Sequence, residues 1–466
     1  LHLSRGLGDV YKRQILTQIL TASSWWEDTM PFESNSLEEH WMPFSGNRDF
    51  KLDPRLVVKS EGMYCWDHKG GKLIDGSSAL FCSPAGHGRR EIADAVHAQM
   101  IENDYTPHFQ LGHPGSFELA ERVARILPEP MNHVFFTNSG SESVDTAMKI
   151  ALAYHRARGD GQRTRFVSRE RAYHGVNMGG LSLSGMVKNR ETFNLTLPNI
   201  SMIRHTWTEE QRFTNGQPQT GAELAEDLQR VCESYGGSTI AAVFIEPVAG
   251  STGTLVPPVG YLDRVREICD QHGILLIYDE VITGFGRMGT AFAAEKFGVI
   301  PDVATMAKAL TNGAIPMGGV AVRDEVYDTV TNASPQNAIE FFHGYTYSAH
   351  PAACAAGIAT QKIYEEDGLF ERANDMSSYF LDAVWSLKDH PLIADLRGIG
   401  MMAGVEVKHD GVPGRRGTQL QKDMFWNGLH VKFTGDNGIL APAFVAERSH
   451  IDEIIDKFRK TLDQHC

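Results

Sequence analysis

Two kinds of hydrophobic pattern alternate along the middle of the chain. Short apolar runs bounded by Gly, Pro or polar clusters predict buried strands at 133–137, 165–168, 240–245, 274–278, 303–306 and 318–322. Between them, apolar residues recur at helical spacing over 142–158, 222–235 and 261–272. Strands that alternate with helices in this way predict an α/β fold with a mostly parallel sheet covered by helices.

The two ends of the chain have different patterns. Alternating apolar and polar residues with frequent glycine predict a small antiparallel sheet near the start, and the last part of the chain is mostly helical. We therefore expect a smaller α+β domain built from both ends. The expected segments are a non-native or disordered leader at 1–29, the N-terminal part of the small domain at 30–110, a large domain at 111–351 and the C-terminal part of the small domain at 352–466.

Composition and charge exclude several classes of protein. The 466 residues are 42% hydrophobic and 22% charged, as in ordinary globular proteins of two or three domains. The formal charge of -14, without long blocks of like charge, argues against a nucleic-acid partner. No apolar run reaches the length of a membrane span. The six cysteines lie far apart without a C-x-x-C pair, which indicates a reducing, cytoplasmic compartment.

One lysine lies in an apolar run just after the predicted strand at 303–306. Lys308, in MAKALTNG, has no charged neighbour along the chain closer than Asp302. Burial at this place favours the neutral amine and lowers its pKa, as a Schiff-base lysine requires. The alternative is a surface lysine whose stem packs on apolar neighbours while its ammonium reaches water. The lysine alone leaves both interpretations open.

Other polar groups follow other strands. Glu246 and Asp279 end two predicted parallel strands, so both belong to the carboxyl edge of the sheet, where ligands bind. In NSGSES, Ser139, Gly140 and Ser141 stand at a predicted helix N-terminus, whose N–H groups and dipole favour an anion. Each of these features, taken alone, also fits an ordinary helix cap.

Three further motifs carry possible chemistry. RAYHG places Tyr173 where its ring can stack on a planar group, or cover the core as a loop tyrosine. GFGRMG at 284–289 matches G-x-G-x-x-G but does not follow its strand directly, so it is a weak dinucleotide motif. HGYTYSAHP at 343–351 carries two histidines without a Cys or carboxylate ligand, and we expect no metal site.

A phosphate cradle, a stacking aromatic, a carboxylate and a buried lysine are together the parts needed to hold pyridoxal 5′-phosphate. The ordered set NSGSES, RAYHG, IEPV, YDEVITGFGRMG, MAKALTNGAIPMG and HGYTYSAHP resembles the class III aminotransferases. Among them it is most similar to the ω-amino acid:pyruvate (β-alanine:pyruvate) aminotransferases. The resemblance implies fold type I of the pyridoxal-phosphate-dependent transferases, with a seven-stranded type of sheet in the large, cofactor-binding domain.

The resemblance also implies roles for single residues. Lys308 is then the Schiff-base lysine, Asp279 the partner of the pyridine nitrogen and Tyr173 the stacking ring. Thr346 reaches the phosphate from a second subunit, which implies an obligate homodimer with shared active sites; a tetramer built from two such dimers is the alternative assembly. The cofactor-binding set implied in this way is Ser139, Gly140, Ser141, Tyr173, His174, Glu246, Asp279, Val281, Lys308 and Thr346.

The substrate pocket follows from the same resemblance. Arg416 is expected to meet a substrate carboxylate, because the guanidinium fork matches a carboxylate, with the adjacent Arg415 as the alternative. Phe81 stands where similar proteins often have tryptophan. The implied substrate-binding residues are Phe44, Phe81, Phe109, Tyr173 and Arg416.

The expected reaction is a ping-pong transamination. A β-alanine-like ω-amino acid or an arylalkyl amine gives its amino group to the cofactor, and pyruvate takes it to become L-alanine. Two alternatives remain. One is another pyridoxal-phosphate reaction on the same scaffold, such as an aminomutase or decarboxylase. The other, from a different class, is a nicotinamide-dependent oxidoreductase that uses GFGRMG.

Overall fold

The structure is a computed structural model that describes residues 37–466, so the leader expected at 1–29 lies outside the described residues. The chain divides into two compact units. Within the described part, the smaller unit comprises residues 37–58 and 66–71, and the larger comprises residues 59–65 and 72–466. The domain boundaries expected at 110 and 351 stay predictions.

The smaller unit contains one short helix, α2 (Asn47–Leu52), whose Phe50 is buried. The Arg55 guanidinium lies 5.1 Å from the centre of the Phe50 ring. In the segment 66–71, the Asp67 carboxylate accepts hydrogen bonds from the backbone N–H of Lys69 and of Gly71, which closes a tight turn. Phe44 also belongs to this unit and is exposed.

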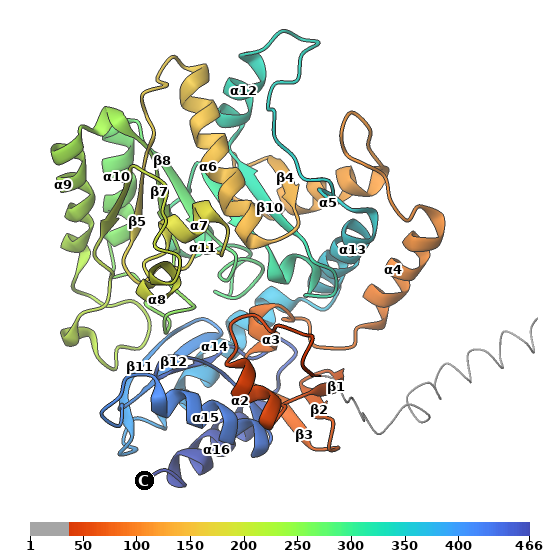
Figure 1. Ribbon diagram of the computed structural model, residues 1–466, viewed down its shortest axis with the longest axis vertical. Helices are drawn as coiled ribbons and strands as arrows, with labels where there is room; N and C mark the ends of the chain where they lie inside the picture. The colour runs from red at the N-terminus through yellow and green to blue at the C-terminus, as the bar shows by residue number, and fades with distance from the viewer. Residues whose placement is uncertain (1–36) are drawn as a thin grey trace, which may run out of the picture. The chain divides into compact units, whose positions relative to one another are not determined.

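A seven-stranded sheet forms the centre of the larger unit (Figure 1). Its order is β4 (His133–Thr137), β10 (Gly318–Val322), β9 (Val303–Met306), β8 (Leu275–Asp279), β7 (Ile240–Ile245), β5 (Arg165–Arg169) and β6 (Ile200–Ile203). The strands from β6 to β9 pair in parallel, and β10 runs antiparallel to both of its neighbours. The predicted mostly parallel, seven-stranded type of sheet is confirmed, although β6 was not predicted.

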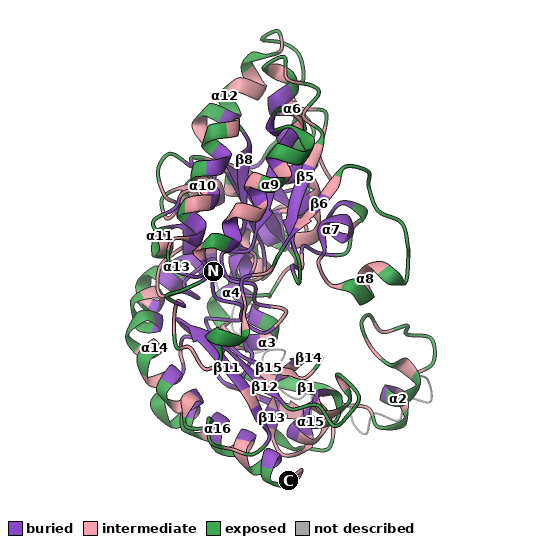
Figure 2. Cartoon of the chain, turned by 90° about the vertical axis from the view of Figure 1, so that its left-hand side faces the viewer, coloured by how far each residue is buried: buried purple, intermediate pink, exposed green. Residues whose placement is uncertain are grey.

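The central strands are apolar throughout because helices cover both faces of the sheet. All residues of β7 and β8 are buried. Alternate residues of these strands enter two separate cores, one with α9 (Glu226–Tyr235) and α10 (Tyr261–His272) and the other with α6 (Gly140–Ala157). Figure 2 shows the sheet as mostly buried, with exposed positions on surrounding helices such as α12 (Asp324–Asn332).

A second, antiparallel sheet comes from the C-terminal part of the chain. It has the order β11 (Ile393–Ile399), β12 (Met402–Val407), β15 (Asn437–Leu440) and β14 (Lys432–Thr434). The neighbouring strand β13 (Leu429–His430) pairs in parallel with β3 (Lys72–Asp75), so residues from both ends of the chain meet in one α+β region. Helices α14 (Leu369–Trp385), α15 (Arg415–Trp426) and α16 (Arg448–Asp463) belong to the same region.

The structure contains further helices and strands outside these two sheets. They are β1 (Val57–Glu61), β2 (Tyr64–Asp67), α3 (Ser78–Phe81), α4 (Arg90–Glu102), α5 (Pro114–Ala124), α7 (Met178–Leu183), α8 (Val187–Glu191), α11 (Ala293–Phe297), α13 (Pro351–Glu366) and four short 3₁₀ turns at Glu209–Gln211, Ala222–Ala225, Gly237–Thr239 and Lys308–Thr311. Within residues 37–466, no helix combines the length and the apolar character needed to cross a membrane.

Gly318, the first residue of β10, offers a test of this packing. A Cβ added there would lie 2.6 Å from each of three oxygens: the carbonyl of Ser139 and the hydroxyls of Thr137 and Ser143. We expect Gly318→Ala to destabilise the protein by about 1–3 kcal/mol, because overpacking forces strand and helix apart. Gly161→Ala is the control, since nothing lies within 4 Å of its added Cβ. Equal melting temperatures for the two variants would contradict this close packing.

Candidate active site

The carboxyl ends of the parallel strands and the segments that follow them enclose a cavity of about 180 Å³. Most of the predicted cofactor-binding residues line it, and Gly175, Ile282 and Ala307 join them. The full lining is Gly140, Ser141, Tyr173, His174, Gly175, Glu246, Asp279, Val281, Ile282, Ala307 and Lys308. The three additional residues each adjoin a predicted one along the chain, and their own types carry no chemical signal.

One wall of the cavity is the N-terminus of α6, which follows β4. The Ser139 hydroxyl caps the helix by accepting a hydrogen bond from the Glu142 N–H at 3.2 Å. Ser139 therefore holds the turn and does not itself line the cavity. The Ser141 hydroxyl accepts the Val176 N–H at 3.0 Å, which ties the helix to the residue that follows RAYHG. N–H groups of a first helical turn lack acceptors within the helix, so this wall suits an anion.

Asp279, the last residue of β8, is held by three donors from different segments. His174 Nδ1 donates to its Oδ2 at 2.7 Å, and the Thr305 hydroxyl and the Val281 N–H donate to its Oδ1 at 3.1 and 3.2 Å. Both Asp279 and His174 are buried. These donors fix the carboxylate in one orientation, because its two oxygens accept hydrogen bonds from all of them.

Glu246, directly after β7, orders the neighbouring aromatic segment. Its carboxylate accepts the Tyr173 N–H at 3.0 Å, and its backbone carbonyl accepts Arg169 Nη2 at 2.7 Å. Burial raises the pKa of the Glu246 carboxyl. Burial also raises the pKa of the Tyr173 hydroxyl, and the nearby charges of Asp279 and Glu246 add to the shift. Tyr173 is thus placed as a neutral ring at the cavity.

Lys308 follows β9 and borders the cavity, so the residue is half-buried. Its φ of +47° lies in the left-handed region, which is strained for lysine and is common at functional sites. Its ammonium lies 5.9 Å from the centre of the Phe81 ring. Burial lowers the pKa of Lys308 against the opposing effects of Cys82, Asp279 and Glu246. This environment favours the sequestered lysine over the surface interpretation.

Several predicted residues lie away from this cavity. Phe109 is exposed and lines a different cavity with His343. Thr346 is exposed, and its carbonyl accepts the Tyr105 hydroxyl at 2.8 Å. Arg416 donates to the Lys408 carbonyl, while Arg415 pairs with Asp410. Phe44 belongs to the other unit. Their functional roles stay predictions.

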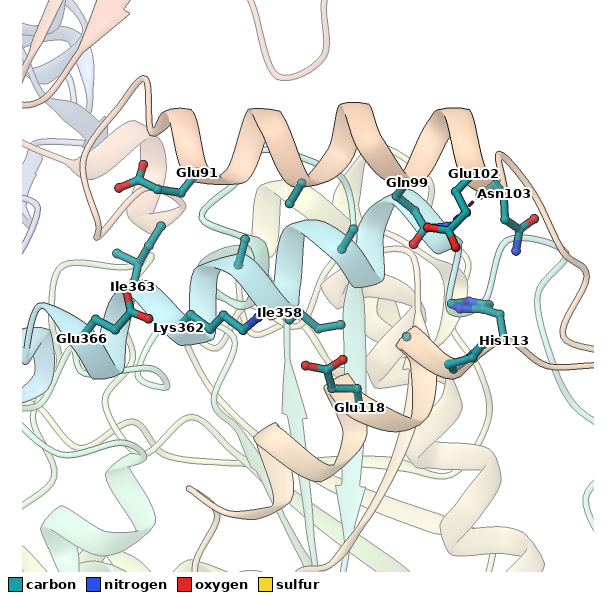
Figure 3. Close-up of a pocket in the computed structure, with 15 residues that line it drawn as sticks. Glu91, Gln99, Glu102, Asn103, His113, Glu118, Ile358, Lys362, Ile363 and Glu366 are labelled. Atoms are coloured by element: carbon teal, nitrogen blue, oxygen red, sulfur yellow. Dashed lines mark hydrogen bonds between the residues drawn. The ribbon is translucent and has the colours of Figure 1, made fainter.

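A larger groove of about 540 Å³ runs between α4 and α13. Figure 3 shows that carboxylates from separate helices line it, with Glu102 on α4, Glu118 on α5 and Glu366 on α13. Lys362 is the one lysine or arginine among the described residues of its lining. The groove contains none of the predicted site residues, so the chemistry belongs to the smaller cavity.

The GFGRMG segment is packed into the interior. Phe285, Arg287 and Met288 are almost fully buried. A Cβ added at Gly286 would lie 2.5 Å from the Phe370 ring, so side chains occupy the space that a dinucleotide would need. The segment connects Asp279 to the rest of the sheet and offers no nucleotide site.

The family model described as aminotransferase class-III matches residues 46–462. The chain belongs to the class-III aminotransferases. An omega-aminotransferase of Caulobacter vibrioides is 49% identical over 435 residues, which cover 93% of this chain and 99% of that protein. A beta-alanine–pyruvate aminotransferase of Pseudomonas aeruginosa is 47% identical over 431 residues, which cover 92% and 96%.

Solved structures of similar enzymes share the fold. The omega transaminase of Pseudomonas jessenii in complex with PMP has a TM-score of 0.87 at 30% identity and covers 92% of this chain and 98% of its own. An (S)-enantioselective omega-transaminase of Thermomicrobium roseum has a TM-score of 0.86 at 36% identity, with coverages of 91% and 96%. The predicted α/β fold of fold type I is confirmed.

Pyridoxal phosphate is the cofactor of this aminotransferase family, and the cavity fits it. The helix N-terminus suits the phosphate, and the Asp279 carboxylate suits a protonated ring nitrogen. The buried Nε2 of His174 has no hydrogen-bond partner within the described residues, which is consistent with a polar group missing from the cavity wall. When bound, the cofactor supplies a ring that accepts electrons from the substrate carbon.

Asp279→Asn tests the role of the buried carboxylate. The asparagine amide is neutral and cannot replace the carboxylate as the partner of a protonated ring nitrogen, so we expect kcat/KM to fall by at least about 100-fold, together with weaker cofactor retention. Asp302→Asn is the control, because Asp302 pairs with Arg266 outside the cavity. It should lower the melting temperature but leave kcat/KM of the folded enzyme within about twofold. Equal kcat/KM values for the two variants would refute this assignment.

Proposed function

We propose that this aminotransferase moves an amino group from an ω-amino acid or primary amine to pyruvate, with an aldehyde or ketone and L-alanine as products. The observation that carries the proposal is the joint placement of Lys308 and Asp279 in one cavity beside the helix N-terminus. The choice of substrates is supported by the names of the relatives from Caulobacter vibrioides and Pseudomonas aeruginosa.

In the proposed mechanism, four groups of this chain have separate tasks. The α6 N-terminus binds the phosphate, and the Asp279 carboxylate accepts a hydrogen bond from the ring nitrogen. Tyr173 covers the ring as a neutral aromatic. Lys308 Nζ, with its lowered pKa, takes the proton from the donor carbon and later returns it to the acceptor side.

We further propose a homodimer that completes the active site. Thr346, Phe109, Phe342 and Tyr347 are exposed in the described chain, and the aromatic residues among them are apolar surfaces that a second copy can cover. Under this proposal, Thr346 reaches the phosphate of the other subunit. We also propose a cytoplasmic location, which is supported by six cysteines that form no disulfide.

Lys308→Ala tests the central step. Lys308→Ala removes the amine that is proposed to move the proton, so we expect amino transfer from β-alanine to pyruvate to fall by at least about 10³-fold. The measurement is the rate of alanine formation, with the ratio of alanine formed to pyruvate consumed as the check on stoichiometry. Lys432→Ala is the control, since Lys432 lies on β14 and not in the cavity lining. An aminomutase or decarboxylase would yield no stoichiometric alanine with the wild-type enzyme. Wild-type rates in Lys308→Ala would overturn the assignment.

Arg416→Ala tests the proposed carboxylate partner. The Arg416 guanidinium donates to the Lys408 carbonyl and pairs with no carboxylate among residues 37–466, so it can exchange that contact for a substrate carboxylate at little cost. We expect KM for β-alanine to rise about tenfold or more, with little change for 1-phenylethylamine, which lacks a carboxylate. Arg415→Ala is the matched control. If the Arg415 variant shows the β-alanine effect and the Arg416 variant does not, Arg415 is the partner.

A further inference from the structure

A strained turn stands directly behind the Lys308 cavity. The segment Ser78–Phe81, labelled α3 in Figure 1, is a left-handed turn in which all four residues have φ between 45° and 67°. Such conformations crowd the Cβ of any residue other than glycine against the backbone, and they occur mostly as single residues. Four in succession persist only where the surrounding structure holds them in place.

The first restraint on this turn is Asp75 at the end of β3. Its Oδ1 accepts the Ser77 N–H at 2.9 Å, and its Oδ2 accepts the Ala79 N–H at 2.6 Å. His87 Nε2 donates to the same Oδ2 at 2.9 Å. Burial would lower the pKa of His87, but the bond to Asp75 outweighs it and raises this pKa to about 10. Asp75 and His87 thus form a charged, hydrogen-bonded pair that is bonded directly to the turn.

The second restraint is the buried Arg287 of the GFGRMG segment. Its Nη1 donates to the carbonyls of Met401 and Pro442 at 2.9 and 2.8 Å, and its Nη2 donates to the Ser78 hydroxyl at 3.2 Å. The guanidinium also lies 5.9 Å from the centre of the Phe81 ring. Within the described residues no carboxylate forms an ion pair with Arg287, so its guanidinium is held by the two carbonyls and the Ser78 hydroxyl.

Both restraints act on one side chain, because the turn ends at Phe81. Phe81 is 3% exposed, and its ring centre lies 5.9 Å from the Lys308 ammonium. A shift of the turn would therefore move the Phe81 ring relative to the reactive amine. The size of the space beside that amine decides which donor side chains fit.

We propose that Asp75, His87 and Arg287 are positioning residues that hold the left-handed turn, and thereby set the amine-donor selectivity through Phe81. This inference rests on the proposed transamination. None of the three residues lines the cofactor cavity. They affect the position of Phe81 only through the turn that they hold.

A metal ion is the competing explanation for the His87 cluster. The potential ligand atoms of Cys65, Asp75 and His87 all lie within 4.8 Å of one another. However, His87 and Asp75 make a direct hydrogen bond, and both Asp75 oxygens already accept backbone N–H groups. These hydrogen bonds hold the turn without a metal ion.

The test is a double-mutant cycle on donor selectivity, measured as the ratio of kcat/KM for 1-phenylethylamine to that for isopropylamine. His87→Leu removes the donor to Asp75 and should change this ratio by about tenfold. His87→Gln, whose amide can donate to Asp75, should restore the wild-type ratio within about twofold. In a Phe81→Ala background, His87→Leu should leave the ratio unchanged. Arg287→Lys should shift the wild-type ratio in the same direction as His87→Leu.

Controls separate this inference from its alternatives. His97→Leu, at an exposed position of α4, should not change the ratio. The proposal is wrong if His87→Leu leaves the ratio unchanged in the wild-type background. It is also wrong if His87→Leu changes the ratio equally with and without the Phe81 ring. About one zinc ion per chain in the purified enzyme would likewise contradict it. The proposed function is read separately, from alanine formation by the wild type. Should pyruvate fail as acceptor, the ratio is still measurable from the donor half-reaction through the cofactor absorbance.

Discussion

The site depends on an amine and a carboxylate that share a buried cavity without a direct ion pair. Within residues 37–466, no carboxylate lies within ion-pair distance of Lys308, while Asp279 is held by His174, Thr305 and the Val281 N–H. The surrounding cavity disfavours the charged form of an amine without an ion-pair partner, and this burial lowers the pKa of Lys308. The Asp279 carboxylate is instead held in place by its hydrogen-bond donors. The two groups therefore have different surroundings within one cavity.

This arrangement follows from the topology of the sheet. Parallel strands bring their carboxyl ends to one edge, so the residues after β7, β8 and β9 meet although they are far apart in the sequence. The sequence predicted this meeting because Glu246, Asp279 and Lys308 each follow a buried strand. Continuous apolar runs predicted the strands of this sheet accurately. Four predicted strands have the same first and last residues as in the structure: 133–137, 240–245, 303–306 and 318–322.

The features that the sequence missed have physical reasons. The strand β6 is short and lies at the sheet edge. The exposed loop before ISMI also carries the apolar residues Phe193, Leu195 and Leu197, so the hydrophobic pattern does not mark where the strand begins. The antiparallel direction of β10 depends on the path of the chain and leaves no trace in hydrophobicity. The left-handed turn could not be predicted, because Ala79, Leu80 and Phe81 all prefer negative φ, and only tertiary contacts of Asp75 and Arg287 impose the strained form.

The same reasoning separates the predicted site residues into two groups. Those fixed by strand ends line the cavity, whereas Phe109, Thr346 and Arg416 lie on loops or on a helix outside it. Loop and helix-surface positions are not constrained by the sheet edge, so a pattern along the chain does not place them. The GFGRMG segment has a structural role in place of the weak dinucleotide-binding one, because its Arg287 packs against the Phe81 ring.

The most direct test of the account is chemical trapping of the cofactor. The holoenzyme is reduced with borohydride, digested and mapped by mass spectrometry. The account predicts a single pyridoxyl-modified peptide that carries the modification on Lys308, with the visible absorbance lost in proportion. Modification of any other lysine, or a reduced protein without covalently attached cofactor, would contradict it.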